Sequence, residues 1–158
     1  MVSLSPQIDI YRDLLVPLGE KLTADERFKD IKHIVNDFET DQPPLMEMPY
    51  LQYDVESPYT DQARGSGAAT LQTRYMTARI LFTYWLYDSH SKQRLNEGLF
   101  KFGGLLLDFL HDWTDLGTGV GISKDPIVWM VDKANADEGF VGAHSIAVTF
   151  DIYSGVGR

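Results

Sequence analysis

An alternation of apolar residues between positions 75 and 87 constrains the fold more than any other feature of the sequence. Every second residue from 76 to 86 is apolar or aromatic: Met76, Ala78, Ile80, Phe82, Tyr84 and Leu86. Successive side chains of a β-strand point to opposite faces, so this pattern predicts a strand with one face in the core. The opposite face mixes polar, charged and aromatic residues, which suits a surface that meets water or a partner.

A helical periodicity follows this strand almost directly. Apolar residues recur at intervals of three and four: Leu95, Leu99, Phe102, Leu106, Phe109 and Trp113. The spacing predicts an amphipathic helix of about six turns over residues 92–113, with hydroxyl caps available at 89–91. Gly98, Gly103 and Gly104 each cost such a helix about 1 kcal/mol relative to alanine. Because glycines are tolerated where packing is close, we expect a helix laid tightly on a sheet.

The N-terminal part predicts a second, shorter helix. Ser5-Pro6 has the form of a helix start, and Ile8, Tyr11 and Leu15 follow at helical spacing. Pro17 should end this helix near Leu15 or kink it, because proline lacks the backbone donor that a helix interior needs. A cap at residues 23–26 predicts that a short helical turn restarts there.

Four further segments read as strands. Residues 31–35, 50–55 and 127–131 predict short strands, and an alternation over 140–153 predicts a long one. Few strands with two helices indicate an α+β fold: a two-layer sandwich, mostly antiparallel, with both helices packed on one face. A chain of 158 residues allows one domain, 1–158.

The connecting segments are rich in turn-forming residues. Prolines mark residues 36–49 as a loop, and Ser57-Pro58 should end the strand that begins at Tyr50. A polar segment at 56–72, with Gly65-Ser66-Gly67 near its centre, predicts a long flexible loop, and a loop of that length is often functional. The tail at 154–158 is expected to be loose.

Charge and composition exclude several classes of protein. The net charge is −9, and residues 1–61 carry 13 acidic against 5 basic side chains (−8), whereas residues 62–158 carry 10 against 9 (−1). Such a chain has no basic stripe that could follow a nucleic-acid backbone. It has no cysteine, which excludes disulfides, thiolate zinc sites and cysteine nucleophiles. No apolar run is long enough to span a membrane, and the N-terminus is not a secretory signal.

No motif in the sequence commits the chain to catalysis or to a cofactor. GTGVG at 117–121 follows a predicted helix, whereas a phosphate-binding loop needs a strand before it. His111 lies near three acids on one helix, but Asp88, His90 or His144 would have to converge on it to hold a metal. Gly65-Ser66-Gly67 is not the constrained turn that a serine nucleophile needs. We therefore predict no enzyme, no cofactor and no metal.

The mixed face of the long strand and the predicted loop supply the candidate interface. Trp85 and Tyr87 point away from the predicted core, where exposed aromatic side chains would act as interface anchors. The candidate contact residues for an oligomer or another partner are Tyr59, Arg64, Gly65, Ser66, Gly67, Arg79, Trp85 and Tyr87.

Five segments in this order carry a resemblance to a known family. They are IYRDLL near the N-terminus, the proline-rich approach into MPYLQYD, the long strand RYMTARILFTYWLYDS, the helix SKQRLNEGLFKFGGLLLDFLHDW and the closing strand HSIAVTFDIYS. The chain resembles the tail-completion proteins of long-tailed bacteriophages, also called tail terminators or head–tail joining proteins. The match is one of pattern and register over most of the chain.

This resemblance implies a structural virion protein of the tail or neck, assembled in the host cytoplasm. Members of the family form a ring, commonly a homohexamer, that terminates the tail tube and joins it to the head connector. The implied partners are therefore further copies of the chain, the tail tube protein and the connector or adaptor protein, with no membrane. DNA would pass through the channel without specific binding, and an acidic lumen would suit that passage.

Two departures and two other classes of function stay open. The loop at 114–126 is longer than the family pattern and the N-terminal part is strongly acidic, which leaves a neck or tail-tube protein as a close alternative. A small-molecule or protein binding module would use a pocket between helix 92–113 and the sheet. A metal-dependent hydrolase would use His111, His90 and nearby acids. We rank assembly first, the binding module second and the hydrolase third.

Overall fold

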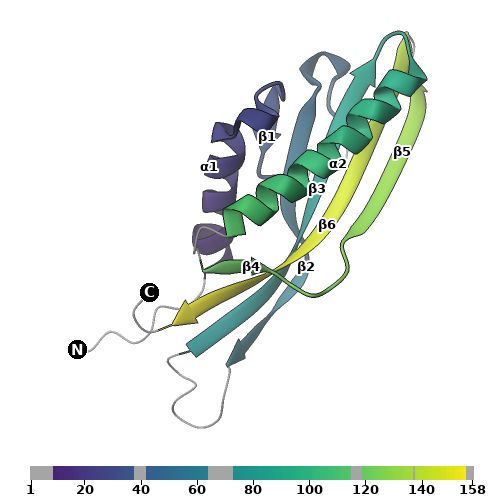
Figure 1. Ribbon diagram of the computed structural model, residues 1–158. Helices are drawn as coiled ribbons and strands as arrows, with labels where there is room; N and C mark the ends of the chain where they lie inside the picture. Colours follow the sequence, from purple (N-terminus) through teal and green to yellow (C-terminus); the bar gives the residue numbers. More distant parts are fainter. Residues whose placement is uncertain (1–8, 38–41, 64–72, 115–118, 137, 156–158) are drawn as a thin grey trace.

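The computed structural model describes residues 9–37, 42–63, 73–114, 119–136 and 138–155. Its helices and strands follow the order α1 (Val16–Ala24), β1 (His33–Val35), β2 (Tyr50–Ala63), β3 (Thr73–Asp88), α2 (Lys92–Thr114), β4 (Val120–Ile122), β5 (Val128–Ala136) and β6 (Gly139–Gly155). Short 3₁₀ turns lie at Glu26–Phe28 and Leu45–Glu47. Both helices lie on the same face of one sheet (Figure 1). The predicted α+β sandwich with two helices on one face is confirmed.

The six strands form one mostly antiparallel sheet. Its order is β1-β2-β3-β6-β4, and β5 pairs with β6 on the same side as β4. Only the β1–β2 pair is parallel. The long β3–β6 pair is in register from Thr73 opposite Gly155 to Asp88 opposite Phe140. These two strands therefore form the spine on which the other elements pack.

The core lies between this spine and the helices. Ala78, Ile80 and Phe82 of β3 are fully buried, as the alternation predicted, and β6 contributes its own alternating set. The buried apolar side chains of α2 are Leu95, Leu99, Phe102, Leu106, Phe109, Leu110 and Trp113. Burying such side chains contributes about 1.5–3 kcal/mol each, so this layer contact dominates the stability of the fold.

The glycines of α2 explain how closely the helix lies on the sheet. A Cβ atom at Gly98 would lie 2.5 Å from Leu86 Cδ2, and one at Gly103 would lie 2.7 Å from the Trp129 ring and 2.8 Å from the His144 ring. At Gly104 a Cβ atom would meet nothing within 4 Å. Close packing against the sheet therefore accounts for Gly98 and Gly103. The expectation that Gly104 also lies at a close contact is wrong.

Pro17 does not end the N-terminal helix. Residues Tyr11–Leu15 form a π-helical turn that passes directly into α1, and Pro17 lies in the first turn of α1. The backbone N–H of Val16 donates to the carbonyl of Tyr11, five residues earlier. The helix thus widens by one residue before the proline instead of breaking, which is how π turns often accommodate local misfit. The predicted start at Ser5-Pro6 lies outside the described residues.

The turn after α1 forms as predicted, but with a different cap. Asp25 accepts a hydrogen bond from the backbone N–H of Arg27 at 2.9 Å and so begins the turn Glu26–Phe28. Thr23 instead donates its hydroxyl to the Gly19 carbonyl.

Ser57-Pro58 does not end β2, so the predicted loop at 56–72 is too long. The strand continues to Ala63, and its pairing with β3 shifts between Val55 and Ser57 and again between Ser57 and Thr60. A proline is tolerated in a strand at such bulges. Residues 64–72 lie outside the described residues, as do 156–158 of the predicted tail.

The segment between α2 and β6 holds more strand than predicted. β4 lies within the segment 114–126, which was taken as a loop. β5 runs from Val128 to Ala136, five residues beyond the end of the short strand predicted at 127–131. The β5–β6 connection therefore shrinks to the immediate neighbourhood of Gly139, whose φ of 141° favours glycine.

Candidate interaction surface

The sheet face opposite the helices has no helix over it (Figure 1). We call it the open face, and its central rows contain Gln52, Asp54, Leu81, Thr83, Trp85, Val128, Met130, Asp132, Ala143, Ser145 and Ala147. The register aligns these residues across the strands; for example, Met130, Ser145, Thr83 and Gln52 lie in one row. Asp54 and Asp132 carry the charges of these rows, and the other side chains are uncharged; Gln52, Thr83, Ala143 and Ala147 are buried. A sheet face turned to water is usually polar, so this face has the composition of a surface that meets another protein.

Trp85 is half-buried on the open face, where the strand parity placed it. Its indole N–H donates to Gln52 Oε1 at 3.2 Å, and Gln52 is only 1% exposed. Tyr50 is the register partner of Trp85 on β2, and the Tyr50 ring lies 5.4 Å from that of His33. His33, Tyr50 and Trp85 thus form an aromatic row, and Gln52 of the neighbouring row holds the indole.

Gln52 holds an unpaired donor beneath this row. Its amide nitrogen Nε2 is buried and has no hydrogen-bond partner among the described residues. A buried amide without a partner costs about 1–3 kcal/mol. The orientation of the amide is fixed by the Trp85 indole, which can only donate and therefore selects the Gln52 oxygen.

Arg79 lies at the rim of the open face. Its Nε atom is 2.7 Å from Glu56 Oε2, and the two side chains are 37% and 36% exposed. Exposed pairs of this kind contribute at most about 1 kcal/mol. Their charges are thus available to orient a partner without being needed for the fold.

Tyr87 has an internal role. Its hydroxyl donates to the backbone carbonyl of Glu138, so it fastens the β5–β6 connection to the end of β3. A Cβ atom at Gly139 would lie 2.6 Å from the Asp88 carbonyl and 3.1 Å from the Tyr87 ring. The connection therefore packs directly on the strand that carries the candidate interface.

The other candidate contact residues cannot be placed as side chains. Tyr59 belongs to β2 by its backbone. Arg64, Gly65, Ser66 and Gly67 lie outside the described residues. Their assignment to an interface stays a prediction.

An exposed apolar cluster at β5 was missed. Val128, Trp129 and Met130 are 45%, 43% and 58% exposed, and Phe100 of α2 is 60% exposed. Trp129 and Phe100 both contact the His144 ring, with centroids 5.3 and 5.6 Å away. We call these four residues the β5 patch. The only signal for this cluster was the run of five apolar residues at 127–131, which predicts a short strand but not its exposure.

His144 is a buried imidazole under α2. Its Nδ1 atom lies 2.8 Å from the Leu99 carbonyl, which can only accept, so Nδ1 carries the proton. Nε2 is buried and has no partner among the described residues. The surroundings are Trp129, Phe100 and Gly103, which offer neither a nucleophile nor a carboxylate. The residue joins α2 to β6 and has no catalytic surroundings.

Asp88 and His90 form a helix cap. Asp88 Oδ1 accepts hydrogen bonds from the backbone N–H groups of His90 and Ser91, at 2.9 and 2.7 Å. These two bonds hold the pKa of Asp88 below its usual value. Ser91 Oγ in turn accepts from the N–H of Arg94, as an N-cap does. Because the Asp88 carboxylate binds the backbone of His90, these residues do not form a catalytic relay.

The metal and phosphate motifs do not gather ligands in the part of the chain that can be described. No group of three His, Cys, Asp or Glu side chains there could hold a metal ion. His111 is exposed on α2. Residues 117–118 of GTGVG lie outside the described residues, and β4 begins at Val120, after a helix.

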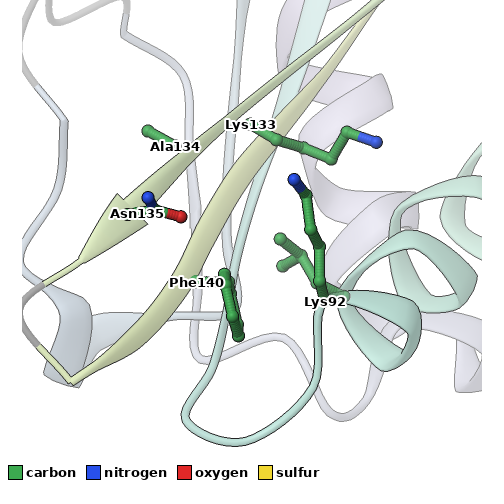
Figure 2. A pocket seen from close by; sticks show the side chains of 6 residues that line it. Lys92, Lys133, Ala134, Asn135 and Phe140 are labelled. Atoms are coloured by element: carbon green, nitrogen blue, oxygen red, sulfur yellow. The ribbon is translucent and has the colours of Figure 1, made fainter.

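A small hollow lies where the binding-module hypothesis would place a pocket. It has a volume of about 200 Å³ and is lined by Lys92, Leu95, Lys133, Ala134, Asn135 and Phe140 (Figure 2). Ligand pockets usually occupy about 300–1,000 Å³. The hollow is cationic rather than apolar, since two lysine side chains reach over it from α2 and β5.

The chain matches no family model and no curated protein. Within the described ranges, neither helix is apolar enough over sufficient length to cross a membrane.

Proposed function

We propose that this protein is a structural assembly subunit that forms a ring at the end of a phage tail tube and joins it to the head connector. The single observation that carries the proposal is the one-sided sheet. Both helices cover one face, and the open face, which carries Leu81, Trp85, Val128 and Met130, has none over it (Figure 1). The sequence resemblance supplies the family, and the open face supplies the surface that assembly needs.

Trp85 would act as the central anchor of the subunit contact. It is half-buried, lies between Tyr50 and Ala143 in its row of the sheet and is held by Gln52. Aromatic residues that are fixed in place lose little conformational entropy on association and dominate many interfaces. Arg79 and Glu56 at the rim would set the orientation, because rim charges tune specificity more than affinity.

The acidic N-terminal region supports a channel that DNA passes without sticking. Asp9, Glu20, Glu26 and Asp30 are exposed on or next to α1. Phosphates are held by lysine and arginine, whereas carboxylates repel them. A ring that turned these acids toward its lumen would let DNA slide.

Native mass spectrometry over a concentration series, with electron micrographs of the same sample, tests the proposal. Closed rings of about six copies are expected, alone or on added tail tubes. A protein that stays monomeric at every concentration and does not bind the tubes would contradict the proposal. Thermal stabilisation by a member of a metabolite panel would then favour the binding module.

The partners that the protein binds distinguish a tail terminator from a neck protein or a tail-tube protein. A terminator ring should bind the end of a finished tube and also the connector. A tube protein should instead polymerise into long tubes, and a neck protein should bind the connector without the tube.

A further inference from the structure

We propose that two free subunits pair through the outer edge of β5, in an antiparallel ladder centred on Val131, before they enter any larger assembly. β5 is hydrogen-bonded to β6 along one side, from Val128 opposite Ala147 to Ala136 opposite Gly139. No strand among the described residues pairs with its other side. That side therefore presents unpaired N–H and C=O groups to a partner strand.

The side chains around this edge favour a partner over water. The β5 patch places Val128 and Met130 on the open face and Trp129 beside Phe100 on the helix side. β5 contains no proline and no break in its pairing with β6. An exposed strand edge with apolar side chains on both faces is a site of strand addition or aggregation unless it is covered.

The two halves of β5 are complementary to each other. The first half carries Trp129, and the second half carries Lys133, which shares a hollow with Lys92 (Figure 2). Trp129 and Lys133 both lie on the helix side, because their register partners are Ile146 and Gly142, which face α2. An antiparallel pair centred on Val131 sets Trp129 opposite Lys133 of the second copy, twice. A lysine over an indole ring is a favourable cation–π contact.

Charge disfavours the neighbouring register that is centred on Asp132. A ladder centred on Asp132 would place two carboxylates directly opposite each other, which destabilises a strand pair. Centring on Val131 sets Asp132 opposite Met130 of the second copy instead. In this register the two Asp132 side chains of the pair do not lie opposite each other.

A second copy fits this edge better than the other edges of the described sheet do. β1 and β4 offer only three residues each, and β2 carries two register shifts beyond Val55. β5 offers nine residues, and its length matches itself. The resulting contact uses the same patch on both subunits and closes on itself.

The pair and the proposed ring exclude each other. A ring that meets a tube on one face and a connector on the other has only a rotation axis along its channel, which leaves no place for a two-fold contact within it. The pair is therefore a state of the free subunit, and its dissociation would precede ring formation. The inference itself rests on β5 and not on the proposed function.

Cysteine crosslinking tests the pairing, because the natural chain has no cysteine. Two self-paired residues of an antiparallel ladder have Cα atoms about 4.5–5.5 Å apart, within reach of a disulfide. Val131→Cys should therefore form a disulfide dimer under mild oxidation roughly tenfold faster than Glu20→Cys, a control on the exposed side of α1. Equal rates for the two variants, together with a monomer in native mass spectrometry, would overturn the pairing.

Two charge variants supply an independent readout. Met130→Glu and Trp129→Lys should each weaken dimerisation of the full chain by roughly tenfold or more, since they put a glutamate opposite Asp132 of the second copy or a lysine opposite its Lys133. Met130 is 58% exposed, so the first variant should retain its thermal unfolding temperature. A folded Met130→Glu protein that dimerises like the natural one would contradict the inference.

The outcomes separate this inference from the ring. Rings without crosslinking of Val131→Cys in the free pool would reject the β5 pair and keep the proposed function. A β5 dimer that never forms rings and never binds tubes would keep the β5 pair and reject the proposed function. Met130→Glu should form rings at a lower protein concentration than the natural chain, because it weakens the competing dimer.

Discussion

Tyr84 and Phe102 stack face to face, with ring centroids 4.3 Å apart and ring planes inclined by 6°. Tyr84 belongs to β3 and Phe102 to α2, so this contact joins the two layers of the fold at their middle. Phe28, from the turn after α1, lies 6.0 Å from Phe102 and adds a third ring. The same cluster thus ties both helices to the sheet.

Replacing Phe102 with alanine should lower the free energy of unfolding by about 3–5 kcal/mol, because it leaves a cavity between the layers. Phe100 on the same helix is 60% exposed and provides the matched control. Phe100→Ala should cost less than about 1 kcal/mol. Urea unfolding of both variants measures the difference, and similar losses for the two would mean that the buried face of α2 has been misassigned.

Ionisation of the Tyr84 hydroxyl should lower the free energy of unfolding at alkaline pH. Burial is the main cause that raises the pKa of Tyr84 from 10.0 to about 12, with a smaller effect from Asp30. A raised pKa means that the folded state favours the neutral phenol. The corresponding stability is therefore complete below pH 10 and is lost as the pH rises from 10 toward 12.

Tyr84→Phe should reduce this alkaline loss. Chemical denaturation at a series of pH values above 9 would show a shallower fall in the free energy of unfolding for the variant. Burial also raises the pKa of Tyr53, so Tyr53→Phe is the variant for comparison. A slope unchanged in Tyr84→Phe would show that its hydroxyl does not titrate with unfolding.

Gly103 and Gly104 should respond in opposite directions to alanine. A Cβ atom at Gly103 would press on the Trp129 and His144 rings, so we expect Gly103→Ala to destabilise the fold by about 1–3 kcal/mol. Gly104 faces open space, and Gly104→Ala should stabilise by up to about 1 kcal/mol through helix propensity. Thermal unfolding of both variants provides the measurement. A stabilised Gly103→Ala would mean that α2 lies farther from β5 and β6.

Trp85→Lys should spare folding and abolish association through the open face. The substitution also leaves Gln52 Oε1 without its donor, which should cost about 1–3 kcal/mol of stability. Trp85→Phe removes the same hydrogen bond but keeps an aromatic ring, so it isolates the effect of the charge. Native mass spectrometry and circular dichroism of both variants are the readouts. An unfolded Trp85→Lys protein would place the indole in the core.

The elements that the sequence predicted well are those buried on one complete face. β3, β6 and α2 each present a long apolar periodicity because each packs along its whole length. β4 was missed since three residues carry no measurable period. The extension of β5 was missed because an exposed edge strand needs no alternation: most of its residues meet water. Proline at position 58 suggested an end to β2, whereas two register shifts let the strand continue.

The candidate surface was predictable only in part. Strand parity alone placed Trp85 and Arg79 on the face away from the core. It could not reveal that Tyr87 is engaged with Glu138, because that bond depends on where the β5–β6 connection folds back. The β5 patch was also beyond reach, since a short apolar run does not distinguish a buried strand from an exposed edge.

β6 is the partner of β3, β4 and β5 at once. It follows all three along the chain, so during synthesis none of these pairings can form until residues 139–155 have left the ribosome. Until then β3 displays its apolar alternation along a free edge, and β4 and β5 have no sheet to join. A nascent chain of this protein therefore passes through a long interval in which its most aggregation-prone strand is uncovered.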